Sequence, residues 1–300
     1  YRLSSTGNLV EEREDLKYTS ATLYGGLNYD ADTTSMLAIN RNYVATSSYQ
    51  RDRLLDESVE TRAGWKYLPG TTVEVRNVGN ILNENEVTAT TYTGMVGTEE
   101  SFKALSGNST PIIHIATHGF YLEDNKASKE HLFELDYSDN VQTISPLKRS
   151  GLIFSGGQHA WLGKEIPEGI DDGVLTAEEI AGMNLTGTDL LVLSACQTGL
   201  GKITYEGVEG LQRGFKIAGV NTIIMSLWEV SDLTTETMMT TFYRSLINGN
   251  SKRDAFDLAI NKVREKTIKM EKSGELRKLH PQDPHLWIAE GHWAAFIMLD

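Results

Sequence analysis

The chain has 300 residues, enough for one large domain or two small ones, and 40% of them are hydrophobic and 23% charged. These proportions are typical of a globular protein and exclude a disordered, fibrous or membrane-embedded chain. Acidic residues outnumber Lys and Arg by 41 to 28, giving a formal net charge of −13. This charge disfavours general nucleic-acid binding, which needs clustered cations.

The sequence contains one cysteine, Cys196, so an internal disulfide is impossible and a disulfide-stapled secreted domain is excluded. The chain lacks an apolar run long enough to span a bilayer. It begins at Tyr1 without a signal-like segment, so we expect a cytoplasmic fragment of a longer protein.

The first half of the chain alternates predicted strands and helices with polar stretches. Strands are expected over residues 21–30, 87–93 and 111–119, and helices over 71–82 and 98–105. Thr71 and Thr98 are the expected N-caps of the two helices. Residues 31–60 and 123–150 are polar and lack clear periodicity, which indicates surface insertions in a single domain spanning residues 1–300.

The second half continues this alternation. Strands are predicted over residues 151–155, 189–195, 221–228 and 293–299, and helices over 176–183, 206–219, 233–247 and 252–266. Thr176 and Glu179 fit a capping box, and Asp172-Gly173 is typical of a hairpin turn. The order of elements predicts an α/β sandwich with a mainly parallel sheet flanked by helices.

Two loops that follow predicted buried strands contain residues suited to nucleophilic catalysis. His118 and Gly119 end the Ile-rich segment, and Cys196 follows the strand of residues 189–195. Functional groups gather at the carboxyl ends of parallel strands. We expect these two strands to be neighbours, which would place His118 beside Cys196. An imidazole next to a thiol suits nucleophilic acyl transfer, and the N–H groups of Gly119 and Cys196 would form an oxyanion hole.

Four segments together resemble a known family. They are HIATHG at 114–119, LLVLSACQTGLG at 190–201, IIMSLWEVSD at 223–232 and WAAFIML at 293–299. Their order and strand context resemble a CHAT domain, the separase-like branch of the caspase-like cysteine peptidases of clan CD. The resemblance implies a caspase–hemoglobinase fold and a His–Cys dyad at His118 and Cys196. It also implies tetratricopeptide repeats before residue 1, through which an activating partner would act.

Both residues also have a purely structural interpretation. Cys196 would then be a small buried hydrophobic residue. His118 would be a structural histidine hydrogen-bonded to the backbone. His114 and His118 share the HxxxH spacing of helical zinc sites, but on a strand they would lie about 13 Å apart. We therefore expect His114 in the core or behind the site, and we expect neither a metal nor another cofactor.

Substrate selection is expected near residues 228–232. In separase-like relatives, a carboxylate after the corresponding Trp-containing strand is associated with binding Arg before the scissile bond. Asp232 is the first candidate here and Glu229 the second, with Trp228 in the core or in a pocket wall. The alternative is that Asp232 caps the helix starting at residue 233. Gly156-Gly157 either borders the cleft or makes a plain turn.

These features predict a cysteine endopeptidase that cleaves protein partners after a basic residue. The alternative is a catalytically silent interaction module that keeps the caspase-like fold and works by binding. The intact His118 and Cys196 pair favours the enzyme. The expected partners are a protein or peptide substrate and an activating protein, without nucleic acid or a membrane span.

Overall fold

The computed structural model describes residues 18–41, 43, 63–122, 147–194, 205–228 and 230–300. Its main feature is a six-stranded sheet in the order β2-β1-β3-β7-β8-β9. The strands are β1 (Ser20–Leu27), β2 (Thr88–Gly94), β3 (Ile112–Ile115), β7 (Leu190–Leu193), β8 (Thr222–Ser226) and β9 (Phe296–Leu299). All neighbours pair in parallel except β8 and β9, which pair antiparallel. The predicted mainly parallel α/β sheet is confirmed.

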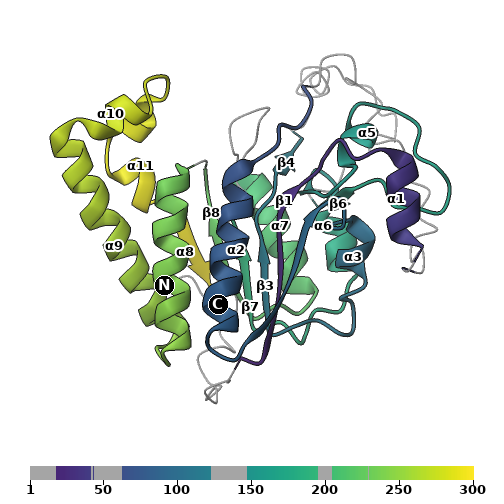
Figure 1. The fold of residues 1–300 in the computed structure, drawn as a ribbon, viewed down its shortest axis with the longest axis horizontal. Coiled ribbons are helices and arrows are strands. Elements are labelled where there is room, and N and C mark those ends of the chain that lie inside the picture. The colour runs from purple at the N-terminus through teal and green to yellow at the C-terminus, as the bar shows by residue number, and fades with distance from the viewer. Residues whose placement is uncertain (1–17, 42, 44–62, 123–146, 195–204, 229) are drawn as a thin grey trace, which may run out of the picture.

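Helices cover both faces of this sheet (Figure 1). One face carries α2 (Pro69–Asn83), α8 (Asp232–Ile247) and α9 (Lys252–Ser273). The other carries α3 (Glu99–Lys103), α6 (Ala177–Ala181) and α7 (Tyr205–Ile217). Shorter elements are α1 (Thr33–Asn40), α5 (Gly157–Trp161), α10 (Glu275–Leu279), η4 (Pro284–Trp287) and α11 (Glu290–Trp293). Among the described helices, none has both the length and the apolar composition needed to cross a bilayer.

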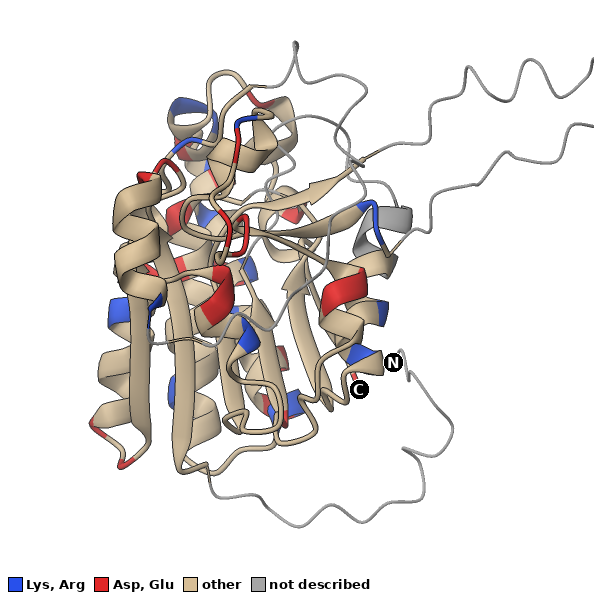
Figure 2. Cartoon of the chain, turned by 90° about the vertical axis from the view of Figure 1, so that its right-hand side faces the viewer, with Lys and Arg blue, Asp and Glu red and all other residues tan. Residues whose placement is uncertain are grey.

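Side chains that alternate in direction along the strands form two separate hydrophobic cores, one on each face of the sheet. Leu190 packs toward α2 and α8, whereas its neighbour Leu191 packs toward α3 and α7. Successive side chains of a strand point to opposite faces, so both faces of these strands must be apolar. The described strands accordingly contain no Asp, Glu, Lys or Arg, and the charged residues lie on helices and connections (Figure 2).

A second, three-stranded sheet lies beyond the end of β3. It consists of β4 (Gly119–Tyr121), β5 (Ser150–Ile153) and β6 (Val174–Thr176), paired antiparallel in the order β4-β5-β6. The carboxylates of Glu99 and Glu100 hold the connection before β6, accepting from the N–H groups of Gly173 and Asp171 at 2.8 and 2.7 Å. The small sheet is thereby tied to α3.

Two of the three helix N-caps that the sequence predicts are confirmed. Thr98 caps α3, and Thr176 forms the predicted capping box with Glu179 at the start of α6. Thr71 is an exception, because α2 begins two residues earlier at Pro69. Thr71 instead donates its hydroxyl to the Leu68 carbonyl and accepts from the N–H of Gly26, which fastens α2 to β1.

Several predicted boundaries are wrong. The strand predicted over 111–119 divides into β3 and β4, because the chain leaves the large sheet after Ile115 and pairs with β5 instead. The strand predicted over 293–299 is β9 only, since Trp293 ends α11. The predicted insertion 31–60 contains α1, which Asp32 caps by accepting from Ser35. Of the second insertion, 123–150, residues 123–146 lie outside the described part.

The predicted hairpin turn at Asp172-Gly173 is also wrong. The chain passes through α5 between β5 and β6, so the two residues shape a local turn and do not join paired strands directly. Asp172 accepts from the Val174 N–H at 2.9 Å, and Gly173 has a φ of +76°. The left-handed backbone at Gly173 explains the glycine.

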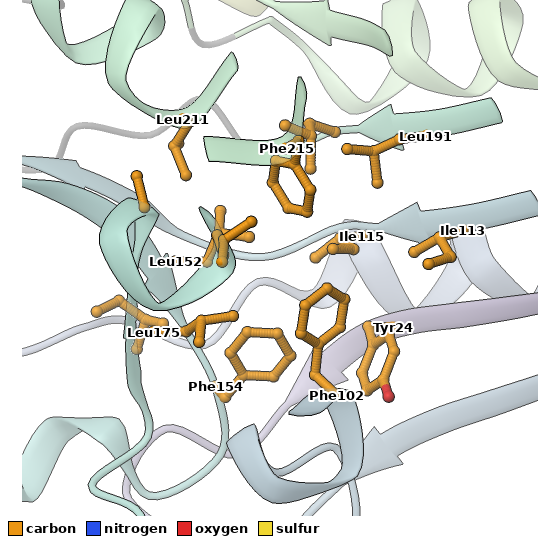
Figure 3. Packing of buried hydrophobic residues seen from close by; sticks show 14 of the residues in the cluster. Tyr24, Phe102, Ile113, Ile115, Leu152, Phe154, Leu175, Leu191, Leu211 and Phe215 are labelled. Carbon is orange, nitrogen blue, oxygen red and sulfur yellow. The ribbon is translucent and has the colours of Figure 1, made fainter. Parts of the chain in front are cut away.

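The aromatic cluster around Phe102 generates the first prediction (Figure 3). Phe102 is fully buried, and its ring lies 5.7 Å from that of Tyr24 and 5.4 Å from that of Phe154. We expect Phe102→Ala to lower the free energy of unfolding by about 3–5 kcal/mol, because it leaves a cavity. Thr90→Ala on the exposed edge strand β2 should change it by less than about 0.5 kcal/mol. Urea denaturation of both variants tests this, and equal effects would contradict the packing described.

Candidate functional site

His118 lies in the short turn between β3 and β4, and it is 2% exposed. Two aromatic side chains contact its ring. The ring centroid lies 4.8 Å from that of Tyr29 and 4.9 Å from that of Trp65. These contacts restrict the rotation of the buried imidazole.

Hydrogen bonding assigns the tautomer of His118. The Nε2 atom lies 2.6 Å from the carbonyl oxygen of Lys66, which can only accept, so Nε2 carries the hydrogen. The Nδ1 atom is buried and has no partner among the described residues. Burial lowers the pKa of His118, and the Lys66 carbonyl only partly opposes this shift. The ring is thus neutral at neutral pH, with an unshared electron pair on Nδ1.

The strand that leads to Cys196 is the direct neighbour of the strand that leads to His118. In the parallel pairing of β3 with β7, Ile115 is the partner of Leu193, and the Ser194 N–H donates to the Ile115 carbonyl at 2.9 Å. His118 and Cys196 each follow these partners by three residues. The predicted adjacency of the two strands is confirmed, while Cys196 itself lies outside the described residues.

The N–H of Gly119 points away from β5. Gly119 is opposite Leu152, but the flanking bonds run from Ile153 N–H to the His118 carbonyl and from Leu122 N–H to the Arg149 carbonyl. This pattern makes Gly119 and Leu152 a non-hydrogen-bonded pair, whose N–H groups face outward from the two strands. Because β4 is an edge strand of the small sheet, the Gly119 N–H is not used in the pairing of its strands.

A cavity of about 220 Å³ opens at the carboxyl ends of β3, β7 and β8. Thr117 and Ser194 line it from the sheet, and Trp228 lines it from the segment after β8. We call this cavity the acidic pocket, because Glu74, Asp232 and Glu236 also line it, whereas none of its described lining residues is Lys, Arg or His. It lies next to the turn that carries His118.

Asp232 occupies the first turn of α8 and is exposed. The alternative that it caps this helix is wrong, because Ser231 is the N-cap and accepts from the Thr234 N–H at 3.3 Å. The Asp232 carboxylate instead lies against Gly70 in the first turn of α2. A Cβ atom at Gly70 would lie 2.4 Å from Oδ1, so only glycine leaves room for this carboxylate.

Of the remaining predicted site residues, Trp228 lines the acidic pocket and Gly156 does not. Trp228 is half-buried, lines the acidic pocket and donates its indole N–H to the Gly291 carbonyl at 2.7 Å. Glu229 lies outside the described residues. Gly156 turns the chain into α5 with a φ of +81° and does not line the pocket, which favours the plain-turn interpretation.

His114 is a buried core residue, as expected from its place on a strand. Its Nδ1 lies 3.1 Å from the Tyr243 hydroxyl and its Nε2 lies 3.1 Å from the Glu74 carboxylate. The described part of the chain contains no cluster of His, Asp and Glu able to hold a metal ion.

Sequence reasoning missed the residues that hold His118 and build the pocket wall. Trp65 and Lys66 follow a polar stretch without periodicity, so no local pattern marked them. Glu74 sits in a helix whose first turns combine Thr, Val and Glu, and only the packing of α2 on the sheet reveals that its carboxylate is buried.

Comparison with known proteins gives a family match over almost the whole chain. The family model described as the CHAT domain matches residues 9–299. Tetratricopeptide repeat protein 28 of Mus musculus is 34% identical over 76 residues, and its Homo sapiens counterpart is 36% identical over the same length. Each match covers 25% of this chain and 3% of the relative, so the chain corresponds to a small part of those proteins.

Because His118 is buried, we expect the stability of the fold to depend on pH. Because the folded pKa lies below the ordinary value of 6.5, the unfolded chain binds more protons in the interval between the two. The contribution of His118 to the free energy of unfolding is therefore complete above pH 6.5. This contribution is lost as the pH falls from 6.5 through the folded pKa. Wild-type protein should lose stability with acid more steeply than His118→Gln. Urea titrations between about pH 5 and 7 measure this, and parallel curves would contradict it.

Proposed function

The chain belongs to the CHAT domain family, a relative of the caspase-like peptidases, and from this membership we propose a cysteine endopeptidase that cleaves partner proteins after a basic residue. Cys196 is the proposed nucleophile and His118 the proposed general base. The observation that carries the proposal is the state of His118. Its Nε2 is anchored to a carbonyl, and its Nδ1 is unpartnered among the described residues. His118 follows β3, the strand next to the one that leads to Cys196.

The proposed reaction uses these atoms in sequence. Nδ1 of His118 takes the proton of the Cys196 thiol, and the thiolate sulfur attacks the scissile carbonyl carbon. The N–H groups of Gly119 and Cys196 donate to the resulting oxyanion. The imidazolium then protonates the leaving amine as the C–N bond breaks, leaving a thioester on Cys196. Water, deprotonated by His118, hydrolyses the thioester and restores the thiol.

The acidic pocket supports selection of a basic side chain. Asp232 and Glu236 are exposed at its rim, and Trp228 offers an aromatic surface on which a guanidinium can stack. Arg should be preferred to Lys, because its planar fork binds carboxylates through two hydrogen bonds, and Asp should be rejected by like charge. Glu229 stays a second candidate for this role.

The relatives' names suggest how the activity is controlled. Both matched relatives are named as tetratricopeptide repeat proteins. By extension, we place such repeats in the same polypeptide as this chain, outside residues 1–300, where an activating protein would bind. A single-cysteine chain with a thiol nucleophile suits the reducing cytoplasm.

The catalytic assignment predicts that Cys196→Ala and His118→Ala each abolish cleavage of an Arg-containing peptide while thermal unfolding stays cooperative. The double variant should be little worse than either single one, because the two residues act as a unit. Undiminished turnover by Cys196→Ala would contradict a cysteine peptidase. Specific peptide binding without turnover by the wild type would favour the silent interaction module.

The position of Asp232 predicts the effect of Gly70→Ala. The new methyl group must push the carboxylate away, which is cheap because only a side-chain end moves. We expect unchanged or slightly higher stability, since Ala favours helix over Gly, and a preference for Arg over a neutral residue reduced by about twofold to fivefold. Ratios of kcat/KM for paired peptides measure this.

Gly79→Ala is the matched control for this change. Gly79 lies in the same helix, and a Cβ there would make only an ordinary contact with Leu23 at 3.4 Å. It should leave the substrate preference unaltered. If both variants keep the wild-type preference, Asp232 has no part in selecting the substrate.

A further inference from the structure

Glu74 is a buried carboxylate that the proposed reaction does not use. It lies in the second turn of α2, lines the acidic pocket, and exposes only 5% of its side chain. A buried carboxylate is costly unless hydrogen-bond donors surround it, so its presence beside a ligand-sized cavity calls for a function.

Two donors from the sheet fix the orientation of this carboxylate. Oε1 lies 3.1 Å from Nε2 of His114, and Oε2 lies 3.1 Å from the hydroxyl of Ser194. Because a carboxylate only accepts, His114 carries its hydrogen on Nε2, and its Nδ1 accepts from the hydroxyl of Tyr243 at 3.1 Å. A carboxylate has about four lone-pair sites, and the hydrogen bonds to described residues use two of them.

The burial of Glu74 distinguishes it from the other two carboxylates of the acidic pocket. Asp232 and Glu236 are exposed, and ion pairs formed by exposed groups are weakened by water and salt. Glu74 is shielded from bulk solvent and pre-oriented by two hydrogen bonds, so a charged hydrogen bond to it would be stronger and more selective. The charge at the floor of the pocket should therefore dominate over the charges at its rim.

We infer that Glu74 is the principal specificity-determining residue of the acidic pocket, where its carboxylate receives the guanidinium of the substrate. This inference rests on the proposed peptidase function. The same carboxylate holds Ser194, which lies two residues before Cys196, so the group that binds the substrate cation also fixes the end of the strand that leads to the nucleophile.

The competing interpretation is that Glu74 only joins α2 to the sheet through His114 and Ser194. Glu74→Gln separates the two roles. The Gln amide oxygen can accept from His114 and its NH₂ group can donate to Ser194, so both bonds survive while the charge disappears. Glu84→Gln is the matched control, because Glu84 is exposed at the other end of the same helix and changes the net charge equally.

The experiment compares two peptides that differ only in Arg or citrulline before the scissile bond. We expect Glu74→Gln to lower the Arg-to-citrulline ratio of kcat/KM by about ten- to a hundredfold, as for a lost hydrogen bond between charged groups. Glu84→Gln should keep the wild-type ratio. The rate of alkylation of Cys196 by iodoacetamide should be similar in all three proteins, which checks that the nucleophile is intact.

A ratio unchanged in Glu74→Gln, from a wild type that prefers Arg, would overturn the inference and leave the peptidase function standing. If the wild type cleaves neither peptide, the proposed function fails, and calorimetric binding of acetyl-arginine amide decides the inference alone. Binding that Glu74→Gln weakens at least tenfold supports the inference, and unaffected or absent binding overturns it.

A crystal structure of the wild type with acetyl-arginine amide tests the same point without a variant. Guanidinium nitrogens within hydrogen-bond distance of Glu74 support the inference. A guanidinium bound only by Asp232 and Glu236 overturns it, and this outcome does not depend on whether Glu74→Gln folds.

Discussion

The parallel hydrogen-bonded pairing of β3 with β7 places the segment that carries His118 next to the strand that leads to Cys196. Both strands are short and fully buried, so their register is fixed by packing on two faces as well as by the ladder. The chain leaves β3 toward His118 and leaves β7 toward Cys196 from equivalent positions. A slip of one residue would reverse the facing of every side chain in the strand and dismantle both cores.

The two buried histidines near the carboxyl end of β3 differ in their hydrogen bonding. His114 is paired on both nitrogens and is structural, whereas His118 is paired on only one nitrogen by the residues that the structure describes. Burial lowers the pKa of His118 and keeps its ring neutral, as required of a group that must first accept a proton. His114 in β3 and His118 in the turn after it thus differ in role because their surroundings differ.

The alternation of elements and the strong apolar runs predicted the sheet, its parallel pairing and the adjacency of β3 and β7. Prediction was least successful where tertiary contacts overrode local pattern. Gly119 belongs to a second sheet because β5 offers it an antiparallel partner, and no local signal distinguishes that from a continued strand. Trp65 and Glu74 acquire their roles from the docking of distant segments on His118 and His114. Asp232 was placed at the pocket by the sequence, but its exposure and its contact with Gly70 depend on how α2 meets α8.

The central claim is that His118 activates Cys196 as a nucleophile toward peptides that carry a basic residue. Labelling with a peptidyl electrophile that ends in Arg, followed by mass spectrometry, tests it most directly. We expect covalent modification at Cys196 that is much faster than with the corresponding Asp electrophile and is lost in His118→Ala. Absence of modification at Cys196, or an equal rate in His118→Ala, would contradict activation of Cys196 by His118.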